Sequence, residues 1–455
     1  MKKIMNKIRG YFTGEGVTSS EIFTILLPVM IDQFFLVSFN FINTAMISSS
    51  GQEAISAVNM IGSLNIFLVQ IFSAIGLGGT VLIAQTFGKK EFKKLGKLSA
   101  GVIHSTFIVG SIIMLLFLIF HQFILGLLFG TADDLVMHNA RIYFIGILCS
   151  YPAHSIIEGI NGSLRGIGKT KESLKNSLIM NTLYLASNFV FVIVLHQGIS
   201  GLIISLLLSR YLTLGVAGMN LYRQSHQFNL TKQDILSIQP KEDKVIIQTA
   251  IPFAAEYMFF NGGKIIMQIM IVSLGTSYIA ANAISVSWIQ MAEIIPSALS
   301  TALVPIIGQA VGRGSIHDIK KLTKTFVLTG MGSFVLIHLV MLPLFPFAMK
   351  LFNAPSELIP LIFRIYINTL IMHVLFWSPS FILPSSLRAI GDGVFTTKVS
   401  LLTMWLFRVG VGYVVGIKLG YGLIGLFVIM TLEWGIRSIV FMWRFKTGRW
   451  QKNIN

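Results

Sequence analysis

The segment Pro28-Val29-Met30-Ile31-Asp32 returns 224 residues later as Pro252-Phe253-Ala254-Ala255-Glu256, with the same spacing between the proline and the carboxylate. This offset also aligns Gly51 with Gly275 and Gln85 with Gln309, and after a one-residue deletion Ser163-Leu164-Arg165 aligns with Ser386-Leu387-Arg388. Polar residues in an apolar chain do not align this often by chance. The chain is therefore predicted to consist of two like halves with a ligand path between them, in which Asp32 and Glu256 are equivalent.

Composition indicates a membrane protein. Hydrophobic residues make up 54% of the 455 residues and charged residues only 12%, against about 25% charged residues in soluble domains. The mean hydropathy of +0.76 leaves no room for a large soluble domain. The single cysteine, Cys149, excludes a disulfide framework and a multi-cysteine metal site. The net charge of +17 is spread over short loops between apolar runs, which argues against nucleic-acid binding.

The apolar runs are long enough to cross a membrane, because about 20 residues span the hydrocarbon core. The first run is much longer than the apolar part of a signal peptide and is therefore counted as a span. Six spans in each half bring both halves into the membrane in the same sense. We predict an all-α integral membrane protein with twelve transmembrane helices in two parallel six-helix repeats, at residues 20–45, 57–86, 98–128, 138–162, 175–196, 200–222, 244–273, 281–310, 321–349, 362–386, 399–417 and 422–445.

Loop charge predicts the orientation. The amino terminus, the carboxyl terminus and the loops after even-numbered spans carry Lys and Arg, whereas the loops after odd-numbered spans are nearly bare of them. The positive-inside rule therefore predicts that both termini are cytoplasmic in the plasma membrane. The predicted domains are an N-lobe at 1–224, a cytoplasmic linker at 225–243 and a C-lobe at 244–455.

Several ionisable residues lie inside predicted spans, where charge is costly and usually functional. Asp32 and Glu256 each follow a proline by four residues, and such a proline frees backbone carbonyls near the carboxylate. A carboxylate with free carbonyls can bind a cation or a proton. Glu433 and Arg437 are four residues apart, so a local ion pair is an equal alternative for them. The other charged candidates in predicted spans are Arg210, Lys264, Glu293 and Arg408, and Glu158 and Glu293 rank lower because they lie close to span ends.

Nucleotide binding and catalysis are disfavoured. The segment Gly166-Ile167-Gly168-Lys169-Thr170 resembles the end of a phosphate-binding loop, but Ser163 stands where the first glycine is required. No His, Cys or Asp cluster has metal-ligand spacing, and His138 beside Asp133 and Asp134 is a faint candidate for catalysis at best. We therefore predict no enzyme, no cofactor and no bound metal, with an ion gradient as the energy source.

Four segments together resemble the multidrug and toxic compound extrusion (MATE) family, and the resemblance covers essentially the whole chain. It implies two six-helix lobes around a V-shaped cavity, a prokaryotic member, and export of cationic amphiphilic drugs in exchange for Na⁺ or H⁺. The segments are Pro28-Val29-Met30-Ile31-Asp32-Gln33, Leu164-Arg165-Gly166-Ile167-Gly168, residues 274–282 (LGTSYIAAN) and Pro305-Ile306-Ile307-Gly308-Gln309 with Gly312.

The chain departs from the family pattern at three positions. Asn43 stands where many bacterial members carry a carboxylate on the first helix, and Asn188 stands at a second amino-lobe carboxylate position. Phe260 stands where many relatives carry a glutamate on helix seven. The ion site of those relatives is therefore not expected in the same form in this chain.

The predicted coupling-ion and substrate site consists of Glu256 with Lys264, Glu433 and Arg437, and Asp32 as the amino-lobe counterpart. Lys264 aligns with Asn40 and therefore has no equivalent in the first half, which places the predicted site in the second half. Aromatic and flexible side chains would accept varied drugs. The predicted cavity lining is Asn40, Asn43, Tyr257, Phe260, Trp288 and Met291.

The main alternative is a flippase for lipid-linked oligosaccharides or lipids of the same wider superfamily. Such a flippase would have a larger, cationic cavity, and Arg210, Lys264, Arg408 and Arg437 agree with that alternative. The predicted partners are small cationic drugs, the coupling ion and the lipid bilayer, with no nucleic acid, and the protein is expected to be a monomer.

Overall fold

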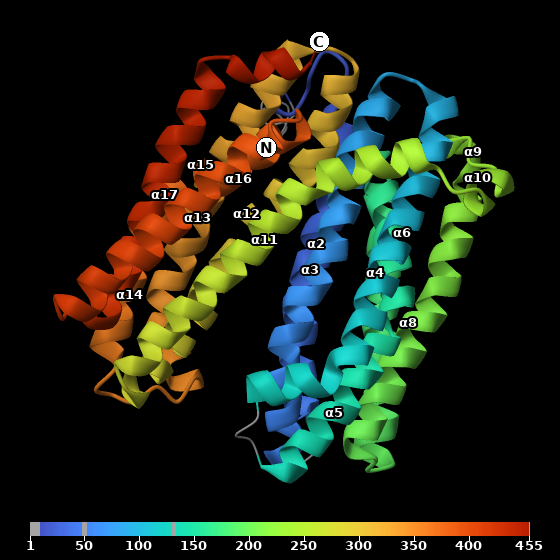
Figure 1. Cartoon of the computed structure of the whole chain (residues 1–455). Helices are drawn as coiled ribbons and strands as arrows, with labels where there is room; N and C mark the ends of the chain where they lie inside the picture. Colours follow the sequence, from blue (N-terminus) through green and yellow to red (C-terminus); the bar gives the residue numbers. More distant parts are fainter. Residues whose placement is uncertain (1–9, 48–51, 130–132, 455) are drawn as a thin grey trace. The chain divides into compact units, whose positions relative to one another are not determined.

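The computed structural model describes residues 10–47, 52–129 and 133–454, and around Asn40 and Asn43 it describes the backbone alone (Figure 1). Within these residues the regular structure is entirely helical. The α-helices are α2 (Ser19–Ile47), α3 (Gln52–Gly88), α4 (Phe92–Phe129), α5 (Asp134–Cys149), α6 (Tyr151–Gly166), α7 (Thr170–Asn188), α8 (Gly198–Arg223), α9 (Ser225–Phe228), α10 (Lys232–Leu236), α11 (Pro240–Ser273), α12 (Thr276–Gly312), α13 (Ile316–Leu351), α14 (Ile359–Met372), α15 (Ser378–Ala389), α16 (Gly393–Leu402) and α17 (Gly422–Lys446).

Short π-helical segments continue several of these helices, namely η2 (Phe189–Val194), η3 (His373–Trp377), η4 (Thr403–Val411) and η5 (Tyr413–Lys418), and a 3₁₀ turn, η6 (Arg449–Asn453), ends the described chain. A π-helical turn shifts the side chains that follow it around the helix, and such turns are frequent at functional sites. Segments η3 and η4 carry residues of the pocket described below.

Ten segments of the described residues are long and apolar enough to cross a membrane. The predicted spans at 138–162 and 244–273 are not among these ten. The first of them is divided at Ser150 into α5 and α6, each of 16 residues. The second lies in α11, whose apolar stretch is interrupted by Glu256 and Lys264. The composition of the helices thus supports a multi-pass membrane protein.

The chain forms two compact units. The early unit is Leu27–Ala254, and the late unit is made of the described residues before Leu27 and after Ala254. Helices α2 and α11 therefore each contribute to both units, and Pro28 and Pro252 lie within two residues of the two boundaries. A proline inside a helix removes one backbone hydrogen bond, so each boundary lies near a weakened point of its helix. The predicted lobes at 1–224 and 244–455 remain a prediction.

In the early unit, α6 packs against α3 and α4, and α7 packs against α8 (Figure 1). Glycines permit the close approach of α3 and α6, because a Cβ atom at Gly162 would collide with the carbonyl group of Gly76. Thr80 Oγ1 donates a hydrogen bond to the Gly162 carbonyl across this contact, at 2.9 Å. Small residues allow this kind of packing between membrane helices.

In the late unit, α12 packs against α13 and α15, and α14 packs against α17. The described residues before α2 also belong to this unit. The carboxylate of Asp318, which is completely buried at the start of α13, accepts hydrogen bonds from the backbone N–H groups of Glu15 at 2.7 Å and Gly16 at 3.0 Å. The ring of Phe12 lies 5.6 Å from that of Phe326.

Replacing Asp318 by Asn is expected to lower the free energy of unfolding by about 1–3 kcal/mol, because hydrogen bonds to a buried charged acceptor contribute this much. Glu21→Gln is the control, since the exposed carboxylate of Glu21 also accepts a backbone hydrogen bond, from Thr18 at 2.7 Å. We expect a smaller loss for the control. Unfolding in mixed micelles, followed by tryptophan fluorescence, measures both variants, and equal losses would contradict a special role for the buried Asp318.

Candidate functional site

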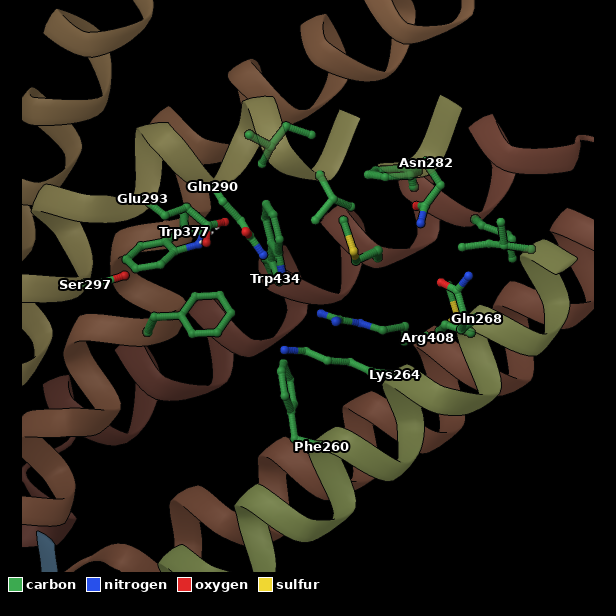
Figure 2. A pocket seen from close by; sticks show the side chains of 18 residues that line it. Phe260, Lys264, Gln268, Asn282, Gln290, Glu293, Ser297, Trp377, Arg408 and Trp434 are labelled. Carbon is green, nitrogen blue, oxygen red and sulfur yellow. Dashed lines mark hydrogen bonds between the residues drawn. The ribbon is translucent and has the colours of Figure 1, made fainter. Parts of the chain in front are cut away.

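A cavity of about 490 Å³ lies inside the late unit, with walls from α11, α12, η3, α15, η4 and α17 (Figure 2). Pockets for drug-sized ligands have volumes of about 300–1,000 Å³ and combine apolar walls with a few polar groups. The polar residues on the wall are Lys264, Gln268, Asn282, Gln290, Glu293, Ser297 and Arg408, and the large apolar ones include Phe260, Met267, Trp377, Phe381, Phe427 and Trp434.

Two cations share one aromatic ring at this wall. The Lys264 Nζ atom lies 5.0 Å from the centroid of the Phe260 ring, and the Arg408 Cζ atom lies 5.2 Å from it. Figure 2 shows both side chains pointing into the cavity, Lys264 from α11 and Arg408 from η4. Phe260, at a position where the family resemblance implies a glutamate, instead places a ring beside two positive charges.

Behind the wall, Glu433 on α17 is completely buried between two arginines. Its Oε2 atom accepts hydrogen bonds from Arg408, including one from Nε at 2.8 Å, and its Oε1 atom lies 3.6 Å from Arg437 Nη1. Thr403 donates a further hydrogen bond to Oε1 at 3.2 Å. The i, i+4 pair of Glu433 and Arg437 expected from the sequence is thus present. Of the two arginines, Arg408 makes the shorter contacts with Glu433.

A chain of buried histidines ends at the only carboxylate that lines this cavity among the described residues, Glu293. His373 Nε2 lies 3.3 Å from Glu293 Oε1, and Trp377 Nε1 donates a hydrogen bond to the same oxygen at 3.2 Å. On the other side of the ring, His373 Nδ1 lies 3.2 Å from His338 Nε2, and His338 Nδ1 lies 3.2 Å from the hydroxyl group of Tyr366. Neither histidine is predicted from the sequence, because residues from α12, α13, α14 and η3 form this chain and no local spacing indicates it.

Glu256 is not on the wall of this cavity. Its Oε2 atom accepts a hydrogen bond from Arg388 Nη1 at 2.8 Å, and its Oε1 atom accepts one from Ser400 at 3.0 Å. Lys264, which was expected to support Glu256, lies on the cavity wall instead. Glu256 is therefore neutralised by the arginine of the repeated Ser-Leu-Arg segment.

The early unit repeats this arrangement with one difference. Asp32 on α2 forms a hydrogen bond with Ser177 and interacts electrostatically with Arg165, and these residues are the repeat equivalents of Ser400 and Arg388. A second carboxylate, Glu158, also acts on Asp32 and lies 3.6 Å from Arg165 Nη2. Asp32 Oδ1 is buried and has no hydrogen-bond partner among the described residues. Two carboxylates thus share one arginine here, whereas in the late unit Phe381 stands in place of Glu158.

The other predicted cavity residues are distributed differently. Phe260 lines the cavity, whereas Tyr257, Trp288 and Met291 are not among its lining residues. The Trp288 ring instead packs against Tyr366, with centroids 6.2 Å apart. The side chains of Asn40 and Asn43 lie outside the described part of the structure. That Asn40 and Asn43 line a cavity stays a prediction.

The apolar helices, the internal repeat and a pocket with charged walls together define a multi-pass membrane transporter. A family model described as MatE matches residues 28–190 and again residues 252–414, and the second match begins and ends 224 residues after the first. The two matches cover most of the chain, which therefore belongs to the MatE family of multidrug and toxic compound extrusion transporters. The predicted two-repeat fold is confirmed.

Known proteins of similar length resemble this chain. The uncharacterized transporter YisQ of Bacillus subtilis is 22% identical over 438 residues, 94% of each chain, and the probable multidrug resistance protein NorM of Thermotoga maritima is 20% identical over 95% of this chain and 93% of its own. Among solved structures, the Vibrio cholerae MATE transporter VcmN in its bent form has a TM-score of 0.85, 19% identity and coverage of 96% of each chain. A MOP superfamily transporter from Pyrococcus furiosus, with a binding pocket of reverse polarity, has a TM-score of 0.85, 16% identity and coverage of 95% and 96%.

Proposed function

We propose that this protein is a secondary active exporter that moves amphiphilic small molecules out of the cell by alternating access, in exchange for H⁺ or Na⁺. Membership of the MatE family and the likeness to probable multidrug resistance proteins support export of foreign compounds. The observation that carries the proposal is the cavity of about 490 Å³, whose aromatic walls and few polar groups suit a drug-sized amphiphile. An amphiphile of either charge fits this volume, and cationic compounds are the class that the family resemblance implies.

The coupling ion is proposed to bind at Asp32 with Glu158 and Arg165. Two carboxylates and one guanidinium group carry a net charge of −1, which one H⁺ or Na⁺ would neutralise. The carboxylates expected to serve in the second half, Glu256 and Glu433, are each paired with arginine. For this reason we favour the first half, although Glu256 and Glu433 remain candidates.

The proposed setting is the cell membrane, with both termini and the loops after even-numbered spans in the cytoplasm. The asymmetry of Lys and Arg between the loops supports this orientation. The protein is proposed to act as a monomer. A single chain would then open the substrate path alternately to the two sides of the membrane.

A flippase for lipid-linked oligosaccharides is the second candidate. Lys264 and Arg408 on the cavity wall favour it, since both can bind phosphate groups. The volume of about 490 Å³ argues against it, because this cavity holds a drug-sized molecule and not a lipid with several sugars. We therefore place this function behind export of small amphiphiles.

Transport by the purified protein in lipid vesicles tests the proposal. A pH gradient and a Na⁺ gradient are imposed separately, and the movement of ethidium and of a fluoroquinolone is followed by fluorescence. We expect one gradient to accelerate movement of at least one compound against its own concentration. Movement that is indifferent to both gradients would contradict ion-coupled export, and rescue of an envelope defect without any drug tolerance would favour the flippase.

A further inference from the structure

The pocket of the late unit has more positive than negative charge. Lys264 and Arg408 lie on its wall, Arg437 lies directly behind it, and the carboxylate among these three cations is that of Glu433. Glu293, the wall carboxylate, faces His373 and Trp377. Even when Glu293 is counted, this group of residues carries a net charge of +1 with neutral histidines.

Lys264 is the cation of this group without an ion pair, and Glu293 acts on it only from a longer distance. No carboxylate among the described residues lies within 4 Å of its Nζ atom, and its side chain is exposed. The Phe260 ring, its close partner at 5.0 Å, is shared with Arg408. Two like charges at one ring repel each other, so an anion placed between them would be stabilised by both.

The remaining wall suits the apolar body and the polar edge of such a ligand. Trp377, Phe381 and Trp434 offer flat apolar surfaces that can stack on an aromatic or aliphatic body. Gln268 and Gln290 place amide groups on the same wall, so they can donate hydrogen bonds to an acidic head group. Figure 2 shows Arg408 and Lys264 projecting from one side of the cavity toward Trp434.

We propose that this pocket binds organic anions, namely small amphiphiles with one carboxylate, sulfonate or phosphate group, and that Lys264 is the residue that determines this charge preference. The head group lies between the Lys264 ammonium and the Arg408 guanidinium, and the apolar body lies against the tryptophans. This inference rests on the proposed transport function and specifies its substrate class. It reverses the charge expected from the family resemblance.

Binding of two matched fluorescent probes tests the inference. The anion 1-pyrenebutanoate and the cation 1-pyrenebutylammonium share one apolar body, and energy transfer from the pocket tryptophans to pyrene reports binding to the full-length protein in nanodiscs of neutral lipid. The variants are Lys264→Met, Lys264→Arg, and Lys175→Met as a control, because Lys175 is an exposed lysine of the early unit paired with Glu172 at 3.0 Å. We expect Lys264→Met to weaken binding of the anion about tenfold and to leave the cation within about threefold.

Lys264→Arg is expected to retain most of the preference for the anion, and Lys175→Met all of it. Retention in the arginine variant separates the loss of charge from misfolding. Tighter binding of the cation than of the anion by the unaltered protein would overturn the inference, and so would an unchanged ratio of affinities in Lys264→Met. A repeat with phosphatidylglycerol in the nanodiscs identifies the source of the anion: competition indicates an anionic lipid, no competition indicates a free organic acid, and both agree with the shared chemistry.

Vesicle transport of the same two probes distinguishes failure of this inference from failure of the proposed function. Gradient-driven movement of the cation alone would refute the anionic substrate class and leave ion-coupled export intact. Tight binding of the anion without gradient-driven movement of either probe would refute ion-coupled export and leave the binding preference intact. Gradient-driven movement of the anion, lost in Lys264→Met, would support both.

Discussion

Replacing Glu433 by Gln is expected to lower the free energy of unfolding by about 3–5 kcal/mol, because removal of one member of a buried ion pair leaves the other charges unpaired. The Glu433 side chain is completely buried, and its single carboxylate contacts both Arg408 and Arg437, which are 5% and 2% exposed. Glutamine preserves the volume and removes the charge. The change in stability therefore measures the electrostatic part of this arrangement.

The matched control is Glu172→Gln, which breaks the exposed pair with Lys175. Exposed pairs of this kind contribute about 0–1 kcal/mol, so we expect a much smaller change. Unfolding by sodium dodecyl sulfate in mixed micelles, followed by tryptophan fluorescence, gives both values. The double variant with Glu433→Gln and Arg408→Gln should recover part of the loss, because it removes one of the two uncompensated cations.

A loss for Glu433→Gln as small as that for Glu172→Gln would show that the two arginines are compensated by other groups. A double variant that is less stable than Glu433→Gln alone would show that Arg408 is stabilised independently of Glu433. Either result would contradict the view that Glu433 is a structural counter-charge, and it would make Glu433 a stronger candidate for ion coupling.

Much of the fold could be predicted from the sequence because the membrane imposes simple rules. Apolar runs of about 20 residues must be helical, and the offset of 224 residues between Pro28 and Pro252 recurs in the two family matches. The two segments that composition alone would miss contain α5, α6 and α11, in which a break at Ser150 and the charges of α11 interrupt the apolar pattern. The repeat supports them as spans, since their counterparts in the other half, at Ile359–Ala389 and Ser19–Phe39, are clearly apolar.

The partners of charged residues were harder to predict than their positions. Helical spacing correctly brought Glu433 and Arg437 together, because residues four apart share a helix face. The predicted site also grouped Lys264 with Glu256, but the partner of Glu256 is Arg388, 132 residues away. A face of a helix does not specify which distant side chain meets it. The repeat contained a usable signal, since Arg388 and Arg165 occupy equivalent positions.

Tertiary packing alone reveals the contact between His373 and Glu293. His373 lies on a π-helical segment, where the usual spacing of 3.6 residues per turn does not apply. His338 and Glu293 lie on other helices, and their distances along the sequence from His373 match no helical spacing. Such a site depends on how helices pack around it, and this information is not local to any stretch of the chain.

Replacing Asp32 by Asn is expected to abolish the response of transport to the ion gradient. For one ion per substrate, a tenfold ion gradient supports about tenfold accumulation, and a carrier without its ion site loses this factor. The reason is the unequal charge of the two repeated sites. Asp32 and Glu158 share Arg165, so one negative charge remains for a cation, whereas Glu256 is matched by Arg388.

Glu256→Gln is the matched control, because it alters the equivalent carboxylate of the other half. We expect this variant to keep its response to the gradient and to lose stability, since Arg388 would then lack its carboxylate partner. Vesicles with imposed H⁺ or Na⁺ gradients give the response, and binding of the pyrene probes shows that the pocket is intact. Glu158→Gln should also lose the response, because it removes the second carboxylate and brings the site to neutrality.

The pair of variants decides in which half of the chain the ion is coupled. If Asp32→Asn keeps the gradient response and Glu256→Gln loses it, the coupling site lies in the second half. The charged residues around Arg165 then have a structural role only. Loss in both variants would mean that the two halves act together, with Arg388 releasing Glu256 during the cycle. The expected result, loss in Asp32→Asn alone, follows because a carboxylate already neutralised by an arginine has little affinity left for an ion.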